Sequence, residues 1–441
     1  MFHDKIKSIF SSSIQSVVSR ISDFSVHPGK DFTRRKKFPA DKLLTFLISE
    51  GSSSTKNELL DFFDMDADKP TDSAFNLQRA KLMPEAVEAV FHKFNESMHS
   101  LSAQKDYRFL AADGSTATYF SSPKFSPAEY FVEPGHSAKG FYSIHINSFY
   151  DLNRHTYTDA LLQPVHQKDE FCAFCQMVDR HPVSDGTKNV YIGDRGYCSY
   201  NNMAHVLEKQ QYFLFRTKDI HSKGLVAGFD FPDDETFEID VDVTLARSHS
   251  SKIKTESRYR RFVDKATSFD FIEYGSKDTY RMTFRIVRFL ISNGSYECVV
   301  TNLPRDEFPP ECIKQVYFSR WGIETSFRKL KYTVGLSNFH AYKAEYVKQE
   351  IWAKMITYNI TETLVNHTVI EEKQTKHDYK INFSSAVHIC RSFLRPAAEE
   401  RPINVIALLQ KELIPIRKER QYPRLKTAHF RKPRYFIYRA A

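Results

Sequence analysis

The sequence predicts an α/β protein in which a mixed β-sheet follows a helical N-terminal region and carries a β-rich insertion. Three observations support this fold class. Apolar residues recur at helical spacing through the first hundred residues, the pattern from residue 106 reads β-β-β-α-β-α-β, and roughly sixty residues after Thr217 alternate apolar with polar side chains. We expect a helical N-terminal unit, two parts of a sheet domain around an insertion, and a helical C-terminal region: 1–100, 101–217 and 306–370 around 218–305, and 371–441.

The N-terminal helices are predicted from their apolar spacing and their start signals. One stripe repeats every three or four positions: Phe2, Ile6, Ile9, Phe10, Ile14, Val17, Val18 and Ile21. A second helix is expected from Pro39, and a third from a capping box formed by Thr55 and Glu58. Two further helices are expected from about Ser73 and Pro84.

The strands and helices of the sheet domain follow from period-2 runs and from turn residues. A buried strand is expected to end at Asp113, and the turn 151–154 is expected to join a hairpin. The remaining expected strands and helices are, in order, strands 140–150 and 155–163, helix 169–180, strand 189–194, a helix from Ser199, strands 211–217, 279–291 and 295–303, and helices 310–332, 345–369, 386–394 and 403–413.

Composition excludes several classes of protein and locates the charge. At 441 residues with 41% hydrophobic residues and six cysteines, the chain is not disordered or disulfide-stapled, and its apolar runs are too short to span a membrane. We therefore expect a soluble, intracellular protein. Of its net charge of +9, +8 lies in residues 411–441, where Lys and Arg alternate with Tyr, Phe and Pro. This tail suits nucleic-acid binding, and a solubilising terminus is the alternative.

Four residues of the predicted helix 310–332 form a candidate site. Tyr317, Arg320, Glu324 and Lys331 lie at offsets 0, 3, 7 and 14, so at 100° per residue they share one face. A carboxylate flanked by a phenol and two cations suits a metal-bound phosphate. Taken alone, such a face is more often an ion-paired helix surface.

Two aspartates placed after strands strengthen the functional interpretation. Asp113 and Asp194 are each followed within two residues by Gly, in ADGS and GDRGY, at expected strand ends. Carboxylates there project into the cleft above the sheet, where ligands of such sheets gather. Together with Glu324 they could hold two divalent ions ~3.5–4 Å apart, which activate a water or a 3′-hydroxyl and stabilise the leaving oxygen of a phosphodiester.

These strings resemble those of bacterial insertion-sequence transposases that carry a DDE triad and the YREK signature. The signature Y-x2-R-x3-E-x6-K is matched without a gap, within the RWxIE and FRxLK contexts usual in that family. The resemblance covers roughly residues 106–370. It implies an RNase H-like fold of the retroviral-integrase superfamily, with a β-rich insertion before the helix that bears the glutamate.

The resemblance also implies roles for individual residues. Asp113, Asp194 and Glu324 would be the catalytic, metal-binding triad, with Mg²⁺ as cofactor and Mn²⁺ as a substitute. Tyr317, Arg320 and Lys331 would hold phosphates of the transposon end. The implied partner is double-stranded DNA, both inverted repeats and target, bound by a homodimer in a synaptic complex with a hairpin intermediate.

Several further residues have both a DNA-binding and a purely structural interpretation. Tyr296 would stack on a flipped base or, by default, pack in its strand. Arg195 would bind phosphate or form an ion pair, and Trp321 is expected to anchor its helix to the core. Basic residues on or before the hairpin, and a run in the insertion, would face DNA or serve solubility: His136, Lys139, His145 and 252–261.

The functional prediction is a Mg²⁺-dependent, cut-and-paste DNA transposase of an insertion sequence, cytoplasmic and nucleoid-associated in a bacterium. It would cut at terminal inverted repeats by hydrolysis and join the freed 3′-hydroxyls to target DNA. Two alternatives stay open. One is a catalytically silent DNA-binding relic of a transposase, and the other is a related metal-dependent nuclease that cuts without joining.

Overall fold

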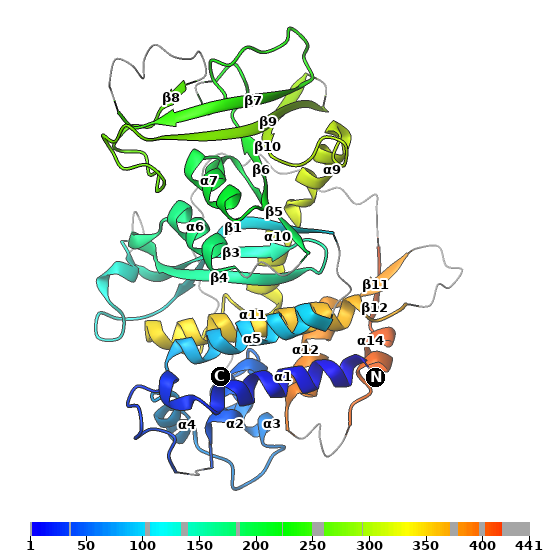
Figure 1. Ribbon diagram of the computed structural model, residues 1–441. Helices are drawn as coiled ribbons and strands as arrows, with labels where there is room; N and C mark the ends of the chain where they lie inside the picture. The colour runs from blue at the N-terminus through cyan, green and yellow to red at the C-terminus, as the bar shows by residue number, and fades with distance from the viewer. Residues whose placement is uncertain are drawn as a thin grey trace.

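The computed structural model consists of one large sheet with helices on both faces and a helical layer below it (Figure 1). It describes residues 2–34, 37–101, 106–133, 140–181, 186–222, 224–248, 260–292, 294–370, 378–396 and 402–416. The basic tail beyond residue 416, most of the run 252–261, and His136 and Lys139 lie outside these residues.

Ten strands of the described residues form a single sheet. Its order is β2-β3-β1-β5-β6-β10-β9-β7-β8, with β4 paired to β3. The strands are β1 (Tyr107–Tyr119), β2 (Phe131–Val132), β3 (Phe141–Asp151), β4 (Thr156–Pro164), β5 (Lys188–Gly193), β6 (Tyr212–Thr217), β7 (Phe237–Ala246), β8 (Arg260–Phe262), β9 (Thr279–Ser292) and β10 (Ser295–Thr301). The α/β class with a large mixed sheet is thereby confirmed.

The first half of the sheet has the predicted order along the chain. Strands β3 and β4 form the expected hairpin and β3 runs antiparallel to β1, whereas β1, β5 and β6 are parallel neighbours. The parallel pairs are joined by crossover segments that contain the helices α6 (Glu170–Arg180) and α7 (Tyr200–Glu208). Asp169 and Ser199 cap these helices through side chains that accept hydrogen bonds from Cys172 and Asn202.

The segment 218–305 extends this same sheet. Strand β10 pairs antiparallel with β6, β9 pairs with β10, and β7 pairs with β9 over ten residue pairs. These strands lie at the top of the view in Figure 1. The alternation of apolar and polar residues that predicted a β-rich segment fits this arrangement, because one face of each strand packs on the core.

Two helical layers cover the sheet. Helices α6 and α7 pack on one face, in a core that includes Leu110, Phe174 and Phe213. The other face is covered by α9 (Pro310–Ser319), α10 (Trp321–Arg328) and the π-helical turn η5 (Lys329–Thr333). The sheet is therefore buried on both sides, as parallel strands require.

The N-terminal helices share one core with the sheet. They are α1 (Phe2–Val18), α2 (Ala40–Ser49), α3 (Thr55–Phe62), α4 (Asp72–Arg79) and α5 (Pro84–Leu101). Their apolar residues form a continuous cluster with Ala111 of β1, Ile323 of α10 and Ile356 of helix α11 (Ala344–Asn366). The C-terminal elements α12 (Phe383–Leu394), α14 (Val405–Lys411), β11 (Tyr379–Ile381) and β12 (Leu413–Pro415) follow, and α12 joins this core.

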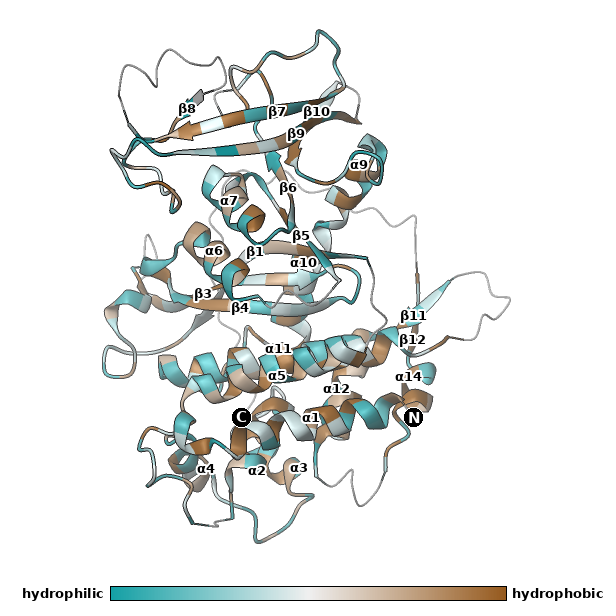
Figure 2. Ribbon diagram, viewed as in Figure 1, coloured by the Kyte–Doolittle hydropathy of each residue, from teal (hydrophilic) through white to brown (hydrophobic). Residues whose placement is uncertain are grey.

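Helix α11 runs between the sheet and the N-terminal helices (Figure 1) and is buried on nearly all sides. Figure 2 shows hydrophilic as well as hydrophobic residues along it. The buried polar groups have partners: Asn359 bonds to both the amide and the carbonyl of Tyr157, and Lys329 bonds to Glu362. Polar groups are buried in proteins when they have hydrogen-bond partners of this kind.

The structure corrects one local prediction for the N-terminal region and confirms another. Ser54 rather than Thr55 is the N-cap of α3, and Glu58 bonds to the amide of Ser53 instead of closing a capping box. The apolar stripe of α1 is confirmed, since Ile6, Phe10 and Ile14 are buried. Among the described helices, none combines the length and the apolarity needed to cross a bilayer.

Candidate active site

The sheet places Asp113 and Asp194 at one level on neighbouring parallel strands. The last residue pair of β1 and β5 is Ala111 with Ile192, and each aspartate follows two residues later. The prediction that the first strand ends at Asp113 is wrong, because residues from Gly114 to Tyr119 continue to pair with β3. The parallel neighbour of β1, strand β5, ends at Gly193, whereas β1 continues. Asp113 therefore lies beyond the end of the strand that pairs with β1 on this side.

Glycines beside both aspartates allow close approach of other side chains. A Cβ on Gly193 would lie 2.6 Å from the Cβ of Tyr197, and a Cβ on Gly114 would lie 2.8 Å from Nε2 of His145. The carboxylates are oriented by backbone amides: Asp113 Oδ1 accepts a hydrogen bond from Gly114 at 2.8 Å, and Asp194 Oδ1 accepts one from Gly196 at 2.8 Å. Both acids are thus held by their own turns.

The segment predicted as one helix from 310 to 332 is divided in the structure. The hydrogen-bond pattern is interrupted at Arg320, although its backbone stays helical (φ −49°, ψ −34°). From Lys329 the helix widens into a π-turn, so the direction of Lys331 differs from that of an ideal α-helix. Helix α10 packs against β1 with Ile323 and Phe327 in the shared core, and the charge of Glu324 acts on Asp113 of that strand.

The four residues of the candidate helix face converge, with unequal burial. Arg320 is buried and its Nη2 donates to Glu324 Oε1 at 2.9 Å. Tyr317 is also buried; burial raises the pKa of its phenol, and Arg320 opposes that rise. Glu324 and Lys331 are partly exposed. Tyr317 is thus placed to position Arg320, which in turn holds Glu324.

Electrostatic interactions link Asp113 to the other acids. Burial raises the pKa of Asp113 to about 6. The amide of Gly114 and the Arg320 guanidinium oppose this rise, whereas Asp194 and Glu324 add to it. Burial also lowers the pKa of Lys331, and Asp113 acts against that shift. The structure therefore brings Asp113, Asp194 and Glu324 together with Arg320 and Lys331.

This acidic group fits divalent cations. The charges of Asp194 and Glu324 act on Asp113 near two cationic side chains, although burial is the main reason that the pKa of Asp113 is raised. Their oxygens do not all lie within 4.8 Å of one another, so the three carboxylates do not surround a single ion in this geometry. Asp113, Asp194 and Glu324 are the residues that would hold divalent ions at this site.

Tyr296 is not brought to this group. Along β10, Glu297 and Val299 face α9, so Tyr296 lies on the opposite face of the strand. Its hydroxyl bonds to Glu235, and the Arg288 guanidinium lies 4.2 Å from its ring centroid. The packing interpretation of this tyrosine fits these contacts.

Sequence reasoning missed Glu297, the next residue of β10. Its carboxylate pairs with Arg216 at 2.8 Å, beside Tyr317. Nothing in the spacing of Glu297 distinguishes it from other strand residues.

Two neighbours of the proposed triad are exposed. Arg195 directly follows Asp194, in the short 3₁₀ helix η4 (Arg195–Tyr197), and its side chain is exposed. The expectation that Trp321 anchors its helix is wrong, since Trp321 is 52% exposed. The core-facing positions of α10 belong to Ile323 and Phe327, and this leaves Trp321 on the outer side. The Arg320 guanidinium lies 5.6 Å from its ring.

His145 is buried rather than exposed on its strand. Its Nε2 lies 3.1 Å from Glu170 Oε1, on the α6 face of the sheet. The pKa of Glu170 is lowered, chiefly by this contact. Glu170 was not among the sequence-predicted residues, and no spacing in the sequence connects it with His145.

Comparison with known proteins identifies the family of the chain. The model of the family described as "Transposase DDE domain" matches residues 104–360, more than half of the chain. None of the curated proteins matches the sequence. Among solved structures, the piggyBac transposase in a synaptic complex with hairpin DNA matches at 10% identity, with a TM-score of 0.41, covering 91% of this chain and 80% of that one. From the family match, this chain belongs to the DDE transposase-domain family.

Proposed function

We propose that this transposase belongs to a bacterial insertion sequence and moves it by cutting and joining DNA at terminal inverted repeats. The observation that carries the proposal is the interaction of Asp113 with Asp194 and Glu324, three acids from β1, the end of β5 and α10. Acids gathered from separate rigid elements at the end of a parallel strand pair suit metal-dependent phosphoryl transfer.

In this proposal Asp113, Asp194 and Glu324 bind two Mg²⁺ ions, for which Mn²⁺ substitutes. Bound ions would supply an activated water or 3′-hydroxyl and stabilise the leaving oxygen. Arg320 and Lys331 flank the acids and bind phosphate oxygens of the transposon end, as guanidinium and ammonium groups do. Tyr317 positions Arg320, and Arg195 contacts the DNA backbone beside Asp194.

The remaining parts of the proposal concern DNA and assembly. The YREK signature supports the assignment to an insertion sequence, and the basic residues of 411–441 support contacts to DNA phosphates. We assign residues 1–100 an accessory DNA-binding role, 101–217 and 306–370 the catalytic sheet, 218–305 the inserted strands, and 371–441 the C-terminal region. Double-stranded DNA would be bound by a homodimer.

Substituting each acid tests the proposal. Asp113→Asn, Asp194→Asn and Glu324→Gln should each lower strand cleavage by about 100-fold or more, because each removes a charge that binds the ions. Binding of a labelled repeat end, measured by gel shift, should change little. The control is Asp242→Asn, an exposed residue of β7, which should keep full activity. Cleavage at the normal rate in any triad variant contradicts the assignment.

A strand-transfer assay separates the alternatives. With a pre-cut repeat end, the wild-type chain should join the 3′-hydroxyl to target DNA in the presence of Mg²⁺. A nuclease would cut an uncut end and yield no joined product, whereas a silent relic would bind the end and do neither.

A further inference from the structure

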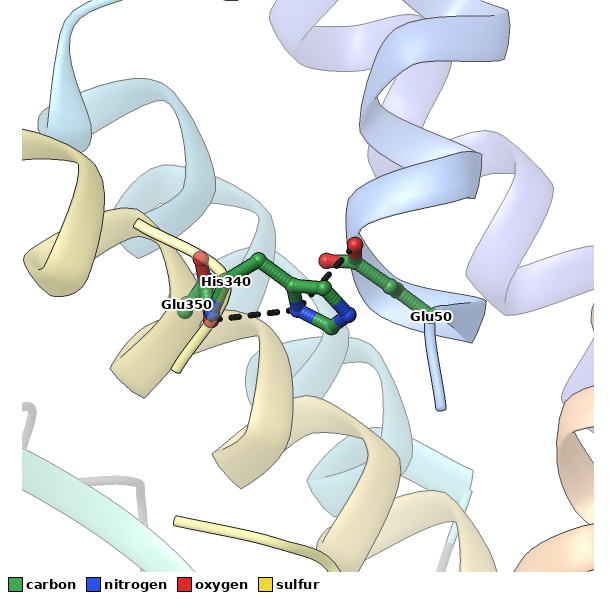
Figure 3. Close-up of side chains that lie close together, drawn as sticks. All are labelled: Glu50, His340 and Glu350. Carbon is green, nitrogen blue, oxygen red and sulfur yellow. Dashed lines mark hydrogen bonds and ion pairs between the residues drawn. The ribbon is translucent and has the colours of Figure 1, made fainter. Parts of the chain in front are cut away.

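A buried cluster of two glutamates and one histidine lies away from the proposed triad. Glu50 caps the C-terminal end of α2, His340 lies in the loop between η5 and α11, and Glu350 belongs to α11. Figure 3 shows the three side chains pointing toward one another. His340 Nδ1 lies 3.1 Å from Glu50 Oε1 and 3.5 Å from Glu350 Oε2.

The cluster is closed to solvent and its charge is incompletely paired. The side chains of Glu50, His340 and Glu350 are 1%, 3% and 1% exposed. Neither carboxylate oxygen of Glu50 has a hydrogen-bond partner. Burial raises the pKa of Glu50, while His340 opposes the rise and Glu350 adds to it. A carboxylate buried in this way is neutralised by a proton or paired with a cation.

The histidine is oriented as a ligand. Its Nε2 lies 2.9 Å from the carbonyl oxygen of Ser53, and because a carbonyl only accepts, Nε2 carries the proton. Nδ1, which carries a lone pair when the ring is neutral, faces the two carboxylates. Metal-binding histidines are characteristically fixed in this way, with the second ring nitrogen donating to a backbone carbonyl.

The distances within the cluster are compatible with a bound ion. The Nδ1 atom lies at ion-pair distance from both carboxylates, without meeting hydrogen-bond geometry to either. Ligands of a tetrahedral zinc ion at about 2.0–2.2 Å are separated from one another by about 3.3 Å. The two observed separations, 3.1 and 3.5 Å, lie on either side of that value.

Neighbouring charges hold Glu350 in place and leave Glu50 for an ion. Glu350 Oε1 accepts hydrogen bonds from both Arg79 guanidinium nitrogens, and its Oε2 accepts one from the amide of His340 at 2.9 Å. Lys354 Nζ lies 3.9 Å from Oε2. Burial opposes the ionisation of Glu350, but the His340 side chain, Arg79 and Lys354 outweigh it and lower its pKa. Among the described residues, no hydrogen-bond donor reaches the Glu50 carboxylate, although His340, Arg79 and Lys354 also act on its charge.

We propose that Glu50, His340 and Glu350 bind one Zn²⁺ ion, with water completing its coordination, and that this ion holds α2 to the loop before α11. Imidazole with carboxylates suits zinc, whereas Mg²⁺ and Ca²⁺ prefer all-oxygen sites. The loop is already pressed against the α2 side: Gly335 has φ +94°, and a Cβ there would lie 3.0 Å from Ser52 Oγ. This site is independent of the proposed DNA chemistry.

Metal analysis of the purified full chain tests the site. After growth with added zinc and removal of loose metal by gel filtration, the wild type should hold about one zinc ion per chain. His340→Gln and Glu50→Gln should lose it. His388→Gln, an exposed histidine of α12, is the matched control and should keep it. The double variant Asp113→Asn, Asp194→Asn should also keep it, which separates this ion from any at the triad.

Thermal unfolding gives a second readout. A strong chelator should lower the Tm of the wild type and of His388→Gln by a few degrees, and zinc should restore it. Glu50→Gln, nearly isosteric, should not respond, and it carries the test if His340→Gln does not fold. Two results would overturn the proposal. One is wild-type protein that contains no zinc and whose Tm does not rise when zinc is added. The other is His340→Gln protein that keeps its zinc.

Discussion

Asp113 is a carboxylate whose charge is disfavoured by its surroundings. Burial and two neighbouring acids raise its pKa to about 6, against Arg320 and the Gly114 amide. Since the folded-state pKa lies above the unfolded value near 3.8, Asp113 contributes stability that is fully present below about pH 4 and is lost as the pH rises through 6. Above that pH the metal-free protein carries the unfavourable charge.

Asp113→Asn should therefore stabilise the metal-free protein at pH 7.5 more than at pH 4.5. The expected difference in the free energy of unfolding is about 1–3 kcal/mol, because Asn removes the charge at similar shape. Urea unfolding in a chelator at the two pH values measures it. Asp68→Asn, with a side chain 92% exposed, should show little change. An equal effect of Asp113→Asn at both pH values would contradict the assigned cause.

The two tryptophans provide a direct test of the corrected position of Trp321. Trp352 is 2% exposed within α11 and its ring lies 5.1 Å from that of Phe91, whereas Trp321 is 52% exposed. Trp352→Ala should cost about 3–5 kcal/mol of stability, and Trp321→Ala less than about 1 kcal/mol. Chemical unfolding of both variants decides. A loss of stability of similar size in Trp321→Ala would show that this side chain packs in the core.

Single residues were predictable from the sequence where the pattern was local or the type was rare. Tyr317, Arg320, Glu324 and Lys331 occupy one short stretch, so helical geometry alone groups them. For Tyr296 the sequence left base stacking and packing both open, because the face of a strand residue changes with every position. The Glu50, His340 and Glu350 cluster was beyond reach, since its members lie on segments that only tertiary packing brings together.

Helices and strands were predictable where the apolar periodicity was strong. The predictions of their boundaries were wrong where pairing with another element sets the boundary. The order from β1 to β6 follows the sequence pattern closely. The extra length of β1 depends on pairing with β3, which no local signal reveals. The division of the segment around Arg320 and the π-turn at Lys329 were also missed, because both alter hydrogen bonding without interrupting the apolar stripe.

At the scale of the whole molecule, α11 joins regions that the sequence divides. It contacts α2, α5 and α12, and it shares a core with α10 and the sheet. The sequence placed a boundary near residue 100 because the pattern changes from helical to extended there. That change of pattern does not show that N-terminal helices and sheet bury a common surface.

Removing residues 1–101 should consequently prevent the rest of the chain from folding cooperatively. The deletion would expose the side of α11 that α2 and α5 cover, together with the Glu350 carboxylate that Arg79 pairs with. Limited proteolysis and thermal unfolding of the fragment measure the outcome. A fragment that melts cooperatively within a few degrees of the full chain would show that the helices form a dispensable unit.

The pairing of β10 with both β6 and β9 makes the inserted strands part of one continuous hydrogen-bonded surface. In the strand order, β7 lies four strands from β5, and neighbouring strands are about 4.8 Å apart, so the inserted strands extend the sheet by about 19 Å beyond β5. The outer strand β7 is therefore connected to the strand that precedes Asp194 through an unbroken series of paired strands.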